Sequence, residues 1–130
     1  MEEITETTET TLYDAKGHAV AYIVEDGQSS IYLWDGHAVA YLVDENKVYG
    51  WNGQHLGWFE EGIMRDIEGK KVGFFIDQCP AVPKMEKTKK TKNTKRLKAT
   101  QKVLKARRSD KELLADTSLD AFLRAGQRAL

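Results

Sequence analysis

Glycine recurs at four comparable places in this chain, and the same residue types surround it each time. The glycines are Gly17, Gly36, Gly53 and Gly69. Five residues earlier stands an aliphatic residue or Met, namely Leu12, Ile31, Val48 or Met64. Four residues later stands a small residue and then an aromatic one: Ala21-Tyr22, Ala40-Tyr41, Gly57-Trp58 and Gly73-Phe74. Units this short bury their apolar residues only against one another, so the pattern predicts a repeat architecture.

Each unit is predicted to form a strand, a tight turn and a second strand. Asp35-Gly36 and Asn52-Gly53 are dipeptides typical of two-residue type I′ hairpin turns. Both faces of the second strands carry apolar residues, since side chains alternate across a strand. The small residues allow close backbone approach, so we expect them at a shared axis with the aromatic residues packed around it. The predicted fold is all-β, with four β-hairpin repeats around a pseudo-fourfold axis.

Composition divides the chain into an acidic and a basic part. Residues 1–83 hold 5 Lys or Arg against 15 Asp or Glu, whereas residues 84–108 hold 12 Lys or Arg against Glu86 alone. We therefore predict an acidic N-terminal arm (1–11), the hairpin domain (12–77), a Lys-rich flexible linker that contains Pro80 and Pro83 (78–108), and a short helical segment (109–130).

The repeats resemble those of the bacterial 4-fold beta flower proteins, in the Tyr-containing first strand, the turn glycine and the Ala-Tyr or Gly-aromatic step. The resemblance covers Leu12 to Ile76 and leaves out the basic segment. It implies four β-hairpin petals around a pseudo-fourfold axis and no known activity. YD repeats and MORN repeats share parts of the pattern, but four copies are too few for a YD shell and MORN units are longer.

Residues that could carry catalysis or bind metal have simpler structural explanations. His18 and His37 follow their glycines directly, whereas His55 is one residue further on and faces the other side of its strand, so a three-histidine zinc site is not expected. Cys79 has no base fixed beside it, and the acids at the turns match ordinary turn chemistry. We expect no catalytic, cofactor or metal site, while Trp34 and Trp51 beside the turns could form a ligand platform.

The Lys-rich segment is the strongest indication of function. Its charge should attract polyanions, nucleic acid first, without sequence preference. The candidate contacts are Lys89, Lys90, Lys92, Lys95, Arg96, Lys98, Lys102, Lys105, Arg107 and Arg108. Two alternatives remain: the segment contacts an acidic protein surface, or it docks on the acidic domain of its own chain or of another copy. Leu97, Val103 and Leu104 have near-helical spacing and could form a basic helix on a partner.

The C-terminal segment carries two possible helix starts, Ser109-x-x-Glu112 and Thr117-x-x-Asp120. The second precedes an apolar stripe of Leu119, Phe122 and Leu123, which is predicted to dock on a protein groove. We expect a non-enzymatic binding or adaptor module in the cytoplasm, or else an assembly component whose basic tail docks on acidic domains of its own kind, with an oligomer possible.

Overall fold

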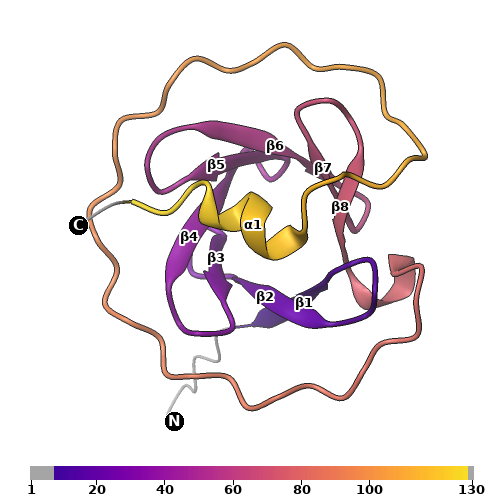
Figure 1. Ribbon diagram of the computed structural model, residues 1–130. Coiled ribbons are helices and arrows are strands. Elements are labelled where there is room, and N and C mark those ends of the chain that lie inside the picture. The colour runs from indigo at the N-terminus through magenta and orange to yellow at the C-terminus, as the bar shows by residue number, and fades with distance from the viewer. Residues whose placement is uncertain (1–7, 129–130) are drawn as a thin grey trace, which may run out of the picture.

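The computed structural model describes residues 8–128, in which eight strands form a closed antiparallel barrel in chain order (Figure 1). The strands are β1 (Glu9–Tyr13), β2 (Ala19–Val24), β3 (Ser30–Leu33), β4 (Ala38–Val43), β5 (Lys47–Gly50), β6 (His55–Glu60), β7 (Ile63–Asp66) and β8 (Lys71–Phe74). A 3-10 turn, η1 (Ile76–Gln78), and one α-helix, α1 (Leu119–Arg124), complete the elements. The all-β prediction is confirmed. Most of the predicted N-terminal arm lies outside the described residues, and β1 begins at Glu9, within that arm.

The sequence pattern places a large residue opposite a small one across the paired strands. The opposed pairs are Leu12 and Ala21, Ile31 and Ala40, Val48 and Gly57, and Met64 and Gly73. All four large residues are fully buried, and they belong to one central hydrophobic cluster. The small partners leave space inside the barrel, which side chains of the C-terminal helix fill, Phe122 near Gly57 and Leu119 near Gly73.

The turns differ from the predicted type I′ geometry. Gly36 has a φ of 97° and Gly53 of 90°, but Asp35 and Asn52 do not share the positive φ that a type I′ turn requires at both central residues. Instead the Leu33 N–H donates to the His37 carbonyl, which closes a three-residue loop ending in a left-handed glycine. The register of β3 and β4 also shifts between Ile31 and Tyr32, where Val39 is the extra residue of a bulge. The type I′ prediction is therefore wrong.

Tyr22 and Tyr41 do not pack around the barrel axis. Each belongs to an outer cluster, Tyr22 with Tyr32 and Tyr41 with Tyr49, separate from the central one. Each adjoins a small residue that faces the interior, and neighbouring residues of a strand point to opposite faces. The prediction that these tyrosines surround the axis is therefore wrong.

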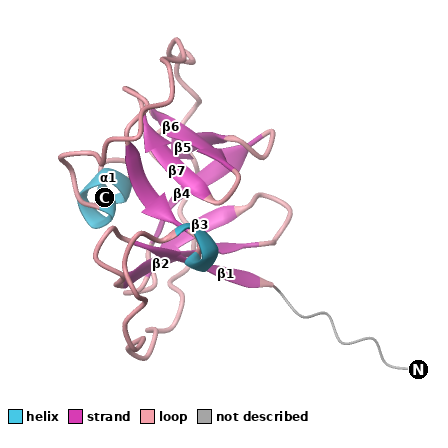
Figure 2. Ribbon diagram, turned by 90° about the vertical axis from the view of Figure 1, so that its right-hand side faces the viewer, coloured by secondary structure: helices cyan, strands magenta, loops and turns pink. Residues whose placement is uncertain are grey.

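Helix α1 closes one end of the barrel (Figure 2). Leu119, Phe122 and Leu123 are buried in the central cluster. A Cβ added to Gly73 would lie 2.8 Å from Leu119 Cδ1, so a larger residue there would displace the Leu119 side chain. The helix begins after Ser118, whose hydroxyl accepts a hydrogen bond from the Ala121 N–H at 3.1 Å. The predicted short helix with its apolar stripe is confirmed, but it begins one residue after the Thr117 start, and no helix begins at Ser109. The stripe packs on the barrel of its own chain, so the prediction that it docks on a partner's groove is wrong.

The first and last strands are joined by much less pairing than the others. One residue pair, Tyr13 with Phe74, links β1 to β8, whereas β2 and β3 share four pairs. The chain leaves the sheet at η1 directly after this contact.

Among the described residues, no helix is long and apolar enough to cross a membrane.

Candidate functional site

The Lys-rich segment encircles the barrel in an extended conformation (Figure 1). We call residues 82–111 the strap. Backbone N–H groups of the strap donate to the carbonyls of all four turn glycines: Lys84 to Gly17, Asn93 to Gly36, Lys102 to Gly53 and Lys111 to Gly69, at 2.8–2.9 Å. The donors are nine residues apart in each case, so nine strap residues span one hairpin. The segment predicted as a flexible linker thus lies along the surface of its own barrel.

The turn glycines also give the strap room to approach. A Cβ added to Gly36 would lie 2.2 Å from the carbonyl oxygen of Thr91, and one added to Gly53 would lie 2.2 Å from that of Thr100. These contacts are far shorter than a carbon and an oxygen can tolerate. Each glycine therefore serves both the turn and the strap.

Side chains of the strap follow a three-residue period, as in an extended polyproline-II-like chain. Every third residue from Glu86 meets the barrel. Lys89 and Lys92 both contact the Glu9 carboxylate at 2.5 Å, and Lys95 contacts Asp26 at the same distance. Further along, Arg107 contacts Glu60 at 2.6 Å. This phase of the strap neutralises barrel acids.

Some cations of the same phase rest on the outer aromatic residues, at nine-residue intervals. Lys89 Nζ lies 4.2 Å from the ring centroid of Tyr22, and Lys98 Nζ lies 3.8 Å from that of Tyr41. The Arg107 guanidinium lies 4.9 Å from the Trp58 ring. Such cation–π contacts stabilise most where water is excluded. Burial raises the pKa of Tyr22 to about 12 and lowers that of Lys98.

A second phase of the strap carries its exposed cations. These are Lys84, Lys87, Lys90, Arg96, Lys102, Lys105 and Arg108, and none has an acidic partner among residues 8–128. The predicted polyanion contacts thus fall into two groups. Lys89, Lys92, Lys95, Lys98 and Arg107 face the barrel, whereas Lys90, Arg96, Lys102, Lys105 and Arg108 belong to the exposed phase. Lys84 and Lys87 were not among the predicted contacts, although the three-residue spacing identifies them.

The tryptophans beside the turns are occupied by the strap. Trp34 Nε1 donates to the Lys87 carbonyl at 2.8 Å, and Trp51 Nε1 donates to the Arg96 carbonyl at 2.6 Å. Trp51 is buried, so it offers no open platform for a ligand.

The histidines lie in different surroundings. His18 and His37 are exposed beside their turns, and each contacts a neighbouring aspartate. His55 is buried: Nδ1 accepts a hydrogen bond from the Lys105 N–H at 3.0 Å, and Nε2–H donates one to the Gly57 carbonyl at 2.9 Å. Burial lowers the pKa of His55. Within residues 8–128 no group of three metal-ligating side chains comes together.

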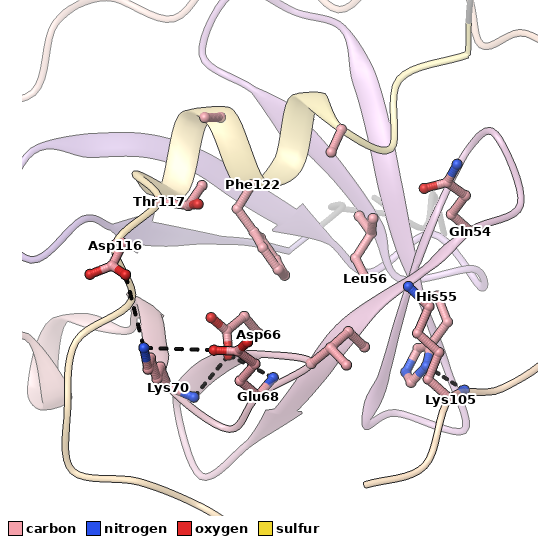
Figure 3. A pocket seen from close by; sticks show the side chains of 13 residues that line it. Gln54, His55, Leu56, Asp66, Glu68, Lys70, Lys105, Asp116, Thr117 and Phe122 are labelled. Carbon is pink, nitrogen blue, oxygen red and sulfur yellow. Dashed lines mark hydrogen bonds and ion pairs between the residues drawn. The ribbon is translucent and has the colours of Figure 1, made fainter. Parts of the chain in front are cut away.

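A cavity of about 540 Å³ lies between β6, the β7–β8 turn and α1 (Figure 3). Phe122 and Leu56 give it apolar walls, and Lys70 contacts Glu68 at 3.6 Å and Asp116 at 3.9 Å across its rim. The Asp66 carboxylate accepts the backbone N–H groups of Glu68 and Lys70, so it serves its own turn. The three acidic side chains here are paired with Lys70 or with backbone N–H groups, so they stabilise the turn and the rim of the cavity.

Comparison with known proteins gives one match. A family model described as 4-fold beta flower protein matches residues 10–123. The match is longer than the resemblance found in residues 12–76, because it includes the strap and most of α1. No curated protein and no solved structure matches the chain.

Proposed function

This chain belongs to the 4-fold beta flower family, and from that premise we propose that it is a non-enzymatic binding module for polyanions, with nucleic acid as the first candidate. The barrel serves as a rigid frame of four equivalent petals, and the strap is the binding element. The equal nine-residue spacing of strap contacts on the four turn glycines supports this fourfold description. The single cysteine, Cys79, fits a reducing compartment, and we place the module in the cytoplasm.

The observation that carries the proposal is the division of strap charge. Five of the twelve cations between residues 84 and 108 face barrel acids or aromatic rings, and seven are exposed without an acidic partner among the described residues. If the strap served only to cover the barrel, its second phase would not need cations. Neutralising phosphates with these side chains releases counterions, which favours binding without sequence preference.

The test measures fluorescence anisotropy of labelled mixed-sequence nucleic acid with the full chain at several salt concentrations. The double variant Lys87→Gln/Lys102→Gln should bind about tenfold more weakly at ~0.1 M salt, and the slope of log K against log salt should fall by roughly 1.5. A control variant, Lys47→Gln/Lys70→Gln, makes the same charge change at side chains that contact Asp44, Glu68 and Asp116 and not the strap, and it should bind within about twofold of the unchanged protein. Equal losses in both variants, or no binding at all, would contradict the proposal.

A second candidate function rests on the other phase of the strap. The contacts of Lys89, Lys92 and Lys95 with Glu9 and Asp26 could form equally well between two copies, which would make the protein an assembly component. In that case the solution mass should exceed that of the monomer and fall to it at high salt, and no polyanion should bind.

A further inference from the structure

The exposed cations of the strap are distributed around the barrel and do not gather on one face. Backbone hydrogen bonds fix their positions: Lys84 on Gly17, Lys90 on the Trp34 carbonyl, Lys102 on Gly53 and Lys105 on His55. These anchors belong to three different hairpins, and Figure 1 shows the strap passing all sides of the barrel. The charge therefore forms a belt.

The size of this belt restricts which polyanion can follow it. Three residues of an extended chain span about 9 Å, so the path from Lys84 to Arg108 is roughly 75 Å long and closes most of a circle. Duplex DNA is stiff over about 150 base pairs, or roughly 500 Å. A duplex can therefore touch only one arc of the belt, with two or three cations, whereas a flexible single strand can follow its whole length.

The third phase of the strap supports the same conclusion independently. It holds no charged residue between Met85 and Ser109. Three of its members are apolar and almost fully exposed: Met85 at 96%, Leu97 at 85% and Val103 at 87%. Each adjoins one of the exposed cations in sequence. Unpaired bases offer apolar faces to such side chains, and bases stacked within a duplex do not.

We propose that the strap is a belt for single-stranded nucleic acid, which winds around the barrel with its phosphates on the exposed cations and its bases against Met85, Leu97 and Val103. This inference rests on the proposed function and narrows it from polyanions in general to flexible single strands. We expect no sequence preference, because the proposed contacts are to phosphates and to the apolar faces of bases.

The experiment compares an unstructured 30-nucleotide single strand with a 30-base-pair duplex, using the full chain and fluorescence anisotropy. The single strand should bind at least tenfold more tightly at ~0.1 M salt. Its salt slope should be about −4 to −5, which corresponds to six or seven phosphates, against about −2 to −3 for the duplex. A duplex that binds as tightly as the single strand would overturn the belt and leave the proposed function standing, whereas absence of binding to both would overturn both.

A triple variant, Met85→Ser/Leu97→Ser/Val103→Ser, tests the apolar contacts while keeping every charge. It should lower single-strand affinity about tenfold and leave duplex affinity within about twofold. The control Ile76→Ser removes an apolar residue that is 61% exposed but lies outside the strap, and it should change neither. An equal loss for both nucleic acids in the triple variant would contradict a role for the apolar residues in contacting bases.

Discussion

Replacing a turn glycine by alanine separates the contribution of the strap from that of the turn. Gly27 and Gly36 have similar backbone angles, with φ of 86° and 97°, but their surroundings differ. A Cβ on Gly27 would meet nothing within 4 Å, whereas a Cβ on Gly36 would lie 2.2 Å from the Thr91 oxygen. Gly27→Ala is therefore a control that carries the backbone strain alone.

The magnitudes follow from these contacts. Left-handed backbone strain costs an alanine about 1 kcal/mol, which is the whole effect expected for Gly27→Ala. Gly36→Ala also displaces the strap, so it loses the Asn93 N–H bond to the Gly36 carbonyl, about 1 kcal/mol, and adds overpacking of about 1 to 3 kcal/mol. We expect a total loss of about 3 to 5 kcal/mol in the free energy of unfolding.

Urea unfolding of the full chain, followed by circular dichroism, measures this difference. Hydrogen exchange at the Asn93 amide provides a local measurement, since this N–H should exchange faster in Gly36→Ala and at an unchanged rate in Gly27→Ala. If the two variants lose the same stability to within about 0.5 kcal/mol, the strap does not rest on Gly36 and the reasoning fails.

Three further predictions concern the core and the titrating groups. Leu123→Ala should lower the free energy of unfolding in urea by about 2 to 5 kcal/mol, because Leu123 is fully buried between α1 and the barrel. Leu113→Ala, at a side chain that is 63% exposed, should change it by less than about 0.5 kcal/mol. Burial lowers the pKa of His55 in the folded state, so its contribution to stability should be complete above the ordinary histidine pKa near 6.5 and decrease as the pH falls below it. Urea midpoints measured between pH 7 and 5 would show this decrease. An unchanged pH dependence in His55→Gln would refute the attribution of the decrease to His55. Burial raises the pKa of Tyr22 to about 12 and also raises the pKa values of Tyr13 and Tyr41. Ultraviolet titration should therefore show several late-ionising tyrosines, one of which is lost in Tyr22→Phe while all are kept in Tyr32→Phe.

The sequence predicts the all-β class and the positions of the small residues. Small residues such as Ala21 could be anticipated as places of close approach, whereas their pairing with a large residue such as Leu12 across the strands was not predicted. Turn type could not be predicted, since a left-handed glycine ends both a two-residue and a three-residue hairpin loop. The position of Tyr22 was mistaken because both strand faces are apolar, and alternation does not tell which face is inside.

The course of the Lys-rich segment was hidden by its composition. A run of lysines with few apolar residues is typical of a disordered chain, and this argued for a flexible linker. The relevant signal is a three-residue period. None of the residues found at every third position from Met85 to Ser109 is charged, and the cations occupy the other two phases. Neither hydrophobic periodicity nor charge counting detects it, because the contacts are backbone hydrogen bonds and cations on aromatic rings.

The single residue pair between β1 and β8 has a consequence for the order in which the protein is synthesised. The last strand ends at Phe74, so all eight strands have been synthesised at that point. The first and last strands are then joined only by the pair of Tyr13 with Phe74. The next stretch of chain passes from η1 to Gly17 on the first hairpin, and α1 reaches the interior only when Leu119 to Leu123 have been added. A nascent chain that has just completed its sheet therefore still exposes its tyrosines and an unfilled centre, and the native state becomes accessible only with the final residues of α1.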